Sequence, residues 1–279
     1  MKWGMVWLIS LLVLAAAGSS GARTWYVNEA GTGDAPTISA AMDSAAYGDT
    51  VLVGPGTYVG SIAVTEGVTL RSEIGPAHTT LTAYCHVIAF PGVVAGCVEG
   101  FTPTGVQCPD FEDAAVEVWG SQGVVVANNV ITGNLYDGIW FYEQSRGEIT
   151  GNTIVDNGHD GIHVSGYSMV DAYRNICVCN VGGFYYADGV GDVACNNSWG
   201  NLSTSWDPTG DGNFSADPLF CDREAGDFTL NRCSPCLPGN HPYGFDCGLI
   251  GALGQGCDYP SHVEGEGGRS WGGVKVLFR

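Results

Sequence analysis

Basic residues are scarce in this chain of 279 residues. Lysine and arginine together number 10, against 29 aspartates and glutamates, so the formal net charge at pH 7 is −19. This excess of negative charge argues against binding of nucleic acid or anionic membranes, because such binding depends on basic residues that contact phosphates. It also disfavours unaided binding of a polyanionic polysaccharide, although bound calcium could reverse the charge locally. We therefore expect no nucleic-acid partner and no cofactor other than, at most, Ca2+.

Long apolar runs are also rare, and the one at the N-terminus is too short to span a membrane comfortably. Lys2 provides a positive start, residues 5–17 are apolar, and small residues precede Arg23. This order is typical of a secretory signal peptide over residues 1–22, and an N-terminal membrane anchor is the alternative. On the first interpretation the protein is secreted or at the cell surface, with no membrane span after cleavage.

Helical periodicity is nearly absent. Only residues 37–46 place apolar side chains such as Met42 on one helical face, with Thr37 available as the N-cap. Elsewhere apolar residues alternate, as Ile139 and Phe141 do, and Val, Ile, Tyr and Trp are abundant. These patterns exclude a helical bundle and predict β structure with one short helix.

The sequence does contain a repeat, which runs through residues 126–201 with a period of 22 or 23 residues. Two asparagine series and one apolar series, each apolar residue preceded by glycine, mark it. Their members are Asn129, Asn152, Asn175 and Asn197; Asn134, Asn157, Asn180 and Asn201; and Ile139, Ile162 and Phe184. At an extended rise of about 3.3 Å per residue, one period makes roughly three short strands with turns. The repeat therefore predicts a solenoid whose asparagines hydrogen-bond between coils.

The repeated unit, Asn-x-Ile-x-x-Asn followed by Asp-Gly-Ile-x-Val, resembles the consensus coil of pectate-lyase-like right-handed β-helix proteins, and the chain looks like a bacterial secreted member. The resemblance implies an all-β fold, a single-stranded right-handed parallel β-helix with a short N-terminal capping helix. It divides the chain into a signal peptide (1–22), a β-helix domain (23–257) and a tail (258–279). Within the domain it implies an N-terminal cap (23–48), coils (49–205) and a cysteine-rich closing segment (206–257). The tail resembles a sorting or attachment signal, or is a strand that docks on the body.

Eleven cysteines follow the predicted signal peptide, which indicates an oxidising compartment, and their odd number leaves at least one unpaired. We expect Cys97 and Cys108 to frame a loop outside the coil. Disulfides are expected mainly among the late cysteines, which are Cys221, Cys233, Cys236, Cys247 and Cys257. Zinc binding by Cys177 and Cys179, or by the Cys233-x-x-Cys236 pair, is the weaker alternative because no second pair lies at metal-site spacing.

A calcium-binding loop is a second possible metal site in the sequence. Asp207, Asp211 and Asn213 offer oxygen ligands close together. Their spacing differs from the EF-hand pattern, so solvated turn residues are the expectation and no metal ligand is predicted.

Strand alternation predicts an aromatic surface. If Ile139 and Phe141 point inward, their neighbours point outward, and equivalent residues of successive coils stack about 4.8 Å apart. The period then places two outward rows, which are Glu117, Trp140, His163 and Tyr185, and beside them Trp119, Tyr142, Ser165 and Ala187. Contiguous exposed aromatic rings usually mark a binding site, and flat rings suit the CH faces of sugars. We therefore predict binding of an extracellular or cell-surface polysaccharide through Glu117, Trp119, Trp140, Tyr142 and Tyr185, or, if the face is covered, a structural adhesion module.

An enzyme is the alternative function, either a glycoside hydrolase or a polysaccharide lyase, with Asp137, Asp160 and His163 as candidate catalytic residues. Asp137 and Asp160 stack one period apart, and stacked carboxylates have separated pKa values, as an acid/base pair requires. They resemble the catalytic aspartates of polygalacturonases, but His159-Asp160 replaces that family's double aspartate. The lyases of the superfamily need a basic residue on this face, and Lys275 is the one lysine left after the signal peptide. Asp-Gly as a plain turn, with glycine at positive φ, is the structural alternative that we favour.

Overall fold

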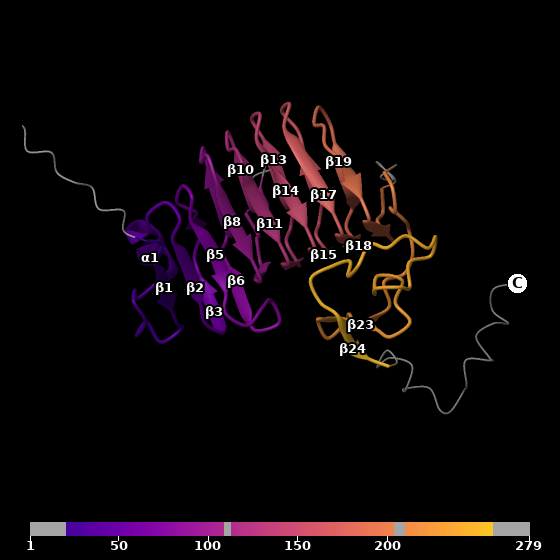
Figure 1. Ribbon diagram of the computed structural model, residues 1–279, viewed down its shortest axis with the longest axis horizontal. Helices are drawn as coiled ribbons and strands as arrows, with labels where there is room; N and C mark the ends of the chain where they lie inside the picture. The colour runs from indigo at the N-terminus through magenta and orange to yellow at the C-terminus, as the bar shows by residue number, and fades with distance from the viewer. Residues whose placement is uncertain (1–20, 109–112, 204–209, 259–279) are drawn as a thin grey trace, which may run out of the picture.

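The computed structural model describes residues 21–108, 113–203 and 210–258. These residues form a parallel β-solenoid in which the chain winds repeatedly through three long sheets (Figure 1). The predicted all-β solenoid with one short helix is confirmed. Most of the predicted signal peptide and the tail after Asp258 lie outside the described residues. Within the described ranges, no helix is both long and apolar enough to cross a membrane.

Each coil contributes strands to the three sheets in turn. Sheet A contains β1 (Thr24–Val27), β2 (Thr50–Val53), β5 (Thr69–Ser72), β8 (Gly96–Glu99), β11 (Val124–Ala127), β14 (Arg146–Thr150), β17 (Met169–Tyr173) and β20 (Val193–Ala194). Sheet B contains β3 (Gly56–Val59), β6 (Thr79–Thr82), β9 (Thr102–Thr104), β12 (Val130–Thr132), β15 (Thr153–Val155), β18 (Ile176–Val178) and β21 (Asn197–Trp199). Sheet C contains β4 (Ile62–Ala63), β7 (Ile88–Pro91), β10 (Ala114–Trp119), β13 (Asp137–Tyr142), β16 (Asp160–Val164) and β19 (Gly182–Tyr186).

The helix α1 (Ile38–Ser44) lies at the N-terminal end of the solenoid, as predicted (Figure 1). Thr37 is its N-cap, and the Thr37 hydroxyl accepts a hydrogen bond from the Ala40 N–H at 3.1 Å. Ile38 and Met42 are buried in the main core. The helix thus covers core side chains that the first coil would otherwise expose to water.

Alternation along the strands fills the interior of the solenoid. In sheet C, Ile139 pairs with Ile162, and Ile162 pairs with Phe184 on the next coil. These side chains and Phe141 are completely buried. The predicted stacking of equivalent residues is therefore confirmed, and it fixes the face on which each neighbouring side chain lies.

The two asparagine ladders are also confirmed, with one correction. In the first ladder, Asn129 donates to Asn152, Asn152 to Asn175, and Asn175 to Asn196 through both backbone and side-chain N–H groups. Asn196 therefore occupies the position predicted for Asn197. Asn197 instead binds the closing segment through the Ala216 carbonyl, because the last step of this ladder is 21 residues and not 22.

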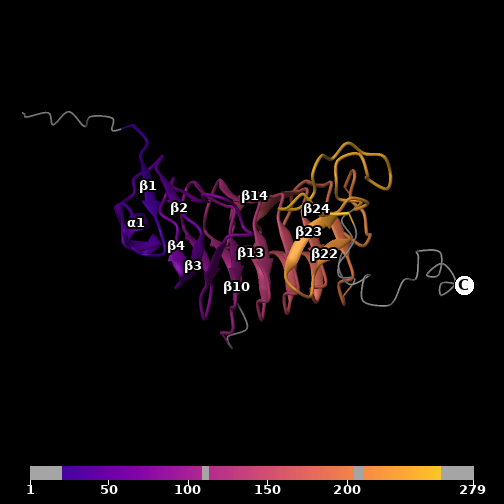
Figure 2. The same cartoon turned by 90° about the horizontal axis from the view of Figure 1, so that it is seen from below.

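The closing segment folds back along the solenoid (Figure 1 and Figure 2). It contributes a small sheet of β22 (Phe220–Asp222), β23 (Asp227–Asn231) and β24 (Gln255–Cys257). Phe220, Phe228 and Leu230 pack in a second core against Val155 and Ile176, which lie on sheet B. Sheet B is thus the sheet that this segment covers.

Three disulfides are present in the described residues, and they correct part of the predicted pairing. The bonds are Cys85–Cys108, Cys195–Cys247 and Cys221–Cys257. Cys97 lies on β8 and is free, so it does not frame a loop with Cys108. Cys233 and Cys236 are also free. Pairing follows which coils and loops become neighbours, and spacing along the chain does not reveal this.

Candidate functional site

The predicted outward rows lie on sheet C in the predicted register. Glu117 pairs with Trp140, Trp140 with His163, and His163 with Tyr185 across four consecutive strands. In the second row Trp119 pairs with Tyr142, whereas the predicted continuation of this row, Ser165 and Ala187, lies just beyond the ends of β16 and β19. The aromatic side chains are only partly buried, whereas the residues between them are completely buried. The inward and outward assignments are therefore correct for the rings, whereas Glu117, predicted in the same outward row, is buried.

The rings, however, stand against one another and do not form a flat platform. Tyr142 stacks on Trp140 with ring centroids 4.0 Å apart and on Trp119 at 6.1 Å, and Trp140 stacks on His163 at 5.3 Å. Tyr185 meets His163 edge-on at 5.0 Å. We call these five side chains the ring stack. Trp140 and Tyr142 each have a ring against both faces, so the surface that they offer to a ligand consists mainly of ring edges.

The Asp-Gly pairs are not turns. Gly138 and Gly161 lie inside β13 and β16, and neither has a positive φ. They are glycine because adjacent coils approach closely: a Cβ on Gly138 would lie 2.7 Å from the Gly161 carbonyl oxygen. The preferred sequence interpretation, in which Asp137 caps a turn, is therefore wrong.

Asp137 instead joins two histidines. Its Oδ1 lies 2.6 Å from His159 Nδ1 and its Oδ2 lies 2.8 Å from His163 Nδ1. Oδ1 also accepts the backbone N–H of Asp160 at 2.8 Å. The Asp160 carboxylate lies 3.5 Å from His159 Nδ1. We call these four residues the Asp/His cluster, and the structure thus brings together the three predicted catalytic residues and His159.

Burial and charge separate the pKa values within the cluster. Burial alone would raise the pKa of Asp137, but hydrogen bonds from His159 and His163 outweigh it and lower that pKa. The hydrogen bond to Asp137 raises the pKa of His159. Burial, and then the charge of Asp137, raises the pKa of Asp160. Titratable groups whose pKa values are shifted in opposite directions are a feature of many functional sites.

A second group of titratable residues lies one coil earlier. Glu117 is buried, and His86 Nδ1 lies 3.9 Å from its Oε2. Burial, together with a hydrogen bond and the like charge of Asp113, raises the pKa of Glu117 from its ordinary 4.5 to about 8. The surroundings of Glu117 therefore favour its neutral, protonated form. The sequence did not reveal His86 and Asp113, because the coil between Ile88 and Val116 is 28 residues long and departs from the period.

Replacing Glu117 should change how stability depends on pH. Because its pKa is raised in the folded protein, the group contributes stability that is complete below about pH 4.5 and is lost as pH rises through about 8. Glu117→Gln stays neutral, so its stability relative to the wild type should increase over this range by a few kcal/mol, at about 1.4 kcal/mol per pKa unit. Urea unfolding of both proteins at several pH values measures this difference. Parallel curves would contradict the raised pKa.

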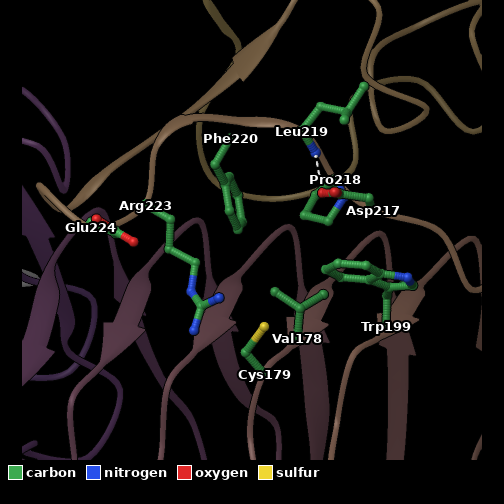
Figure 3. Close-up of a pocket in the computed structure, with 9 residues that line it drawn as sticks. All are labelled: Val178, Cys179, Trp199, Asp217, Pro218, Leu219, Phe220, Arg223 and Glu224. Atoms are coloured by element: carbon green, nitrogen blue, oxygen red, sulfur yellow. Dashed lines mark hydrogen bonds between the residues drawn. The ribbon is translucent and has the colours of Figure 1, made fainter. Parts of the chain in front are cut away.

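A hollow of about 280 Å³ lies elsewhere, between sheet B and the closing segment (Figure 3). The Phe220 ring points into this hollow from the closing segment, and Trp199 and Cys179 line the opposite wall. The Arg223 side chain extends from the closing segment toward sheet B. It is paired with Asp156, with Nε 3.0 Å from Oδ2. The guanidinium is thus already neutralised. Sequence patterns could not predict this hollow, because segments far apart in the chain form its walls.

Comparisons with known proteins agree with this architecture. Residues 71–199 match the family model described as "Right handed beta helix region". No curated protein matches the chain significantly. Among solved structures, a pectin methylesterase mutant in complex with a hexasaccharide matches with 12% identity and a TM-score of 0.35, covering 64% of this chain and 67% of that chain. So distant a likeness carries no argument about activity. The family match over residues 71–199 and the parallel three-sheet solenoid agree with the fold that the sequence resemblance implies, a right-handed parallel β-helix.

Proposed function

We propose that the protein binds a neutral extracellular polysaccharide along the outer face of sheet C. The observation that carries this proposal is the ring stack, which runs without a break from Trp119 to Tyr185 across β10, β13, β16 and β19. These rings lie on the outer face of the sheet, so they do not contribute to the packing of the core. The disulfides fit a secreted protein, and a secreted protein encounters extracellular polysaccharides.

The dimensions of the face suit a polymer. Parallel strands lie about 4.8 Å apart, a distance similar to the length of one sugar unit in an extended chain. A polysaccharide that runs along the solenoid axis would therefore place successive sugars on successive strands. The ring edges would contact its apolar CH groups, and His163 and the neutral Glu117 would bond its hydroxyls. The net charge of −19 favours a neutral chain over a polyanionic one.

Removing two central rings tests this proposal. In Trp140→Ala/Tyr142→Ala the middle of the ring stack is lost while the inward neighbours Ile139 and Phe141 are kept. We expect binding to the best ligand from a glycan-array screen to weaken at least about tenfold, since each lost contact of this kind is worth roughly 1 kcal/mol. Affinity electrophoresis or calorimetry measures the change, and circular dichroism checks that the fold is intact.

Tyr243→Ala is the matched control, because Tyr243 is an exposed aromatic residue on the closing segment. It should bind glycan as tightly as the wild type. Equal weakening in both variants, or full binding by the double variant, would remove the ring stack from the site. A screen without any glycan ligand would reject the proposal itself and would favour a structural module.

Hydrolysis of the bound glycan is a second candidate function, and the raised pKa of Glu117, which keeps its carboxyl group protonated, favours it. A neutral carboxyl group beside the ring stack can protonate a glycosidic oxygen, while the ionised Asp137 lies on the adjacent strand. Asp137 is largely enclosed by the histidines, so its role would be to orient them. Reducing-sugar and unsaturated-product assays on each bound glycan separate the functions: Glu117→Gln should abolish hydrolysis and keep binding.

A further inference from the structure

The Asp/His cluster has the composition of a metal site. Asp137 begins β13, Asp160 begins β16, His159 immediately precedes β16, and His163 lies on it. Each residue offers one ligand atom, and the four atoms all lie within 4.8 Å of one another. Two imidazole nitrogens and two carboxylate oxygens are a ligand set that zinc accepts in proteins.

The distances require only a small adjustment. The carboxylate oxygens of Asp137 lie 2.6 Å and 2.8 Å from the two Nδ1 atoms, and Asp160 Oδ2 lies 3.5 Å from His159 Nδ1. Ligands at about 2.0–2.2 Å from a tetrahedral zinc ion are roughly 3.3 Å apart. Since all four ligand atoms lie within 4.8 Å of one another, a metal ion would replace the two hydrogen bonds of Asp137 after side-chain shifts of up to about 1 Å.

The cluster buries two carboxylates side by side next to two imidazole rings. Asp137 and Asp160 are 5% and 7% exposed. Within the described residues the Asp160 carboxylate accepts no hydrogen bond and is paired with His159 Nδ1 at 3.5 Å. Burying two carboxylates together is costly unless a cation compensates them. One divalent ion with two neutral imidazoles makes the group electrically neutral.

The surroundings hold the ligands in place. Trp140 stacks on one face of His163, and Tyr185 meets the ring edge-on. The His159 carbonyl accepts the Val181 and Gly182 N–H groups of the next coil. A Cβ on Gly158, which precedes His159, would overlap the Leu135 carbonyl. Ligands fixed by packing on adjacent strands bind a metal without much loss of conformational freedom.

We propose that Asp137, His159, Asp160 and His163 bind one divalent first-row transition metal ion, with zinc as the best fit. Calcium fits poorly because it takes six to eight oxygen ligands and two of these four ligands are nitrogen. The calcium loop considered from the sequence fits no better: Asn213 Oδ1 accepts two hydrogen bonds from Asn196, and Asp207 lies outside the described residues. The metal site does not depend on the proposed glycan binding.

Titration of the metal-free, untagged protein with Zn2+ tests the site, followed by calorimetry and by a competing chelator. We expect one ion per chain, no displacement by excess Ca2+, and affinity at least about 100-fold lower in His159→Gln and in His163→Gln. His159 is half exposed, so its replacement leaves the fold intact. Co2+ should give visible bands of nitrogen and oxygen ligation without a thiolate charge-transfer band.

Three control variants locate the ion independently. His78→Gln removes an exposed histidine, His86→Gln disrupts the group around Glu117, and Cys233→Ser removes an exposed thiol. All three should bind Zn2+ as the wild type does. Absence of stoichiometric binding, loss of binding in a control variant, unchanged binding in both histidine variants, or competition by Ca2+ would each overturn the proposal.

Discussion

Gly161→Ala should unfold the protein or destabilise it by about 3 kcal/mol or more, because the new methyl group has no room between two coils. A Cβ at this position would overlap Cys177 Sγ and lie 2.9 Å from Asn180 Nδ2 and 3.0 Å from the Gly183 carbonyl oxygen. Each of these atoms belongs to a fully stacked part of the repeat. Urea or thermal unfolding monitored by circular dichroism measures the loss.

Gly254→Ala is the matched control. It adds the same methyl group where no atom lies within 4 Å, at a glycine whose φ is not positive. Its stability should match the wild type within about 0.5 kcal/mol. If both variants unfold alike, general glycine requirements and not coil contact explain the effect. A stable Gly161→Ala protein would mean that the coils are farther apart at this strand.

Asn152→Ala should destabilise the protein by roughly 3 kcal/mol, because several buried groups lose partners at about 1–3 kcal/mol each. The side-chain carbonyl oxygen of Asn152 accepts hydrogen bonds from the backbone and side-chain N–H groups of Asn129. Its amide donates to the Val126 carbonyl at 2.8 Å and to Asn175 at 3.1 Å. The loss should appear as a lower midpoint of urea unfolding.

Thr57→Ala serves as the control for Asn152→Ala, since it removes a polar side chain from an exposed strand position. Little or no change in stability is expected there. Equal midpoints for Asn152→Ala and the wild type would show that the ladder contributes nothing beyond the strand hydrogen bonds.

The repeat could be recognised from the sequence because successive coils carry the same residue types at equivalent positions. Asn152, Ile162 and Gly161 recur at a fixed step, and in a parallel solenoid a fixed step along the chain becomes direct contact in space. Fold, register and the outward position of Trp140 and Tyr142 therefore followed from local patterns. The error at Asn197 arose where the step changed, because two adjacent asparagines offer the same signal.

Only part of the candidate site could be predicted from the repeat in the sequence. Asp137, Asp160 and His163 belong to the repeat, so their proximity could be predicted. The direction in which the His159 ring points could not, since it depends on the rotamer that lets Nδ1 meet Asp137. Likewise, the raised pKa of Glu117 results from burial beside Asp113, and no spacing in the sequence encodes burial.

By itself the sequence determined the β-helix, its capping helix and the face that carries the rings, because these features arise from contacts between residues one period apart. Only the tertiary structure decided which cysteines pair, where the closing segment docks and how two histidines share Asp137. Those features depend on the packing of segments with no common period. Their geometry is set by the shape of the surfaces that meet, and that shape exists only once the coils have formed.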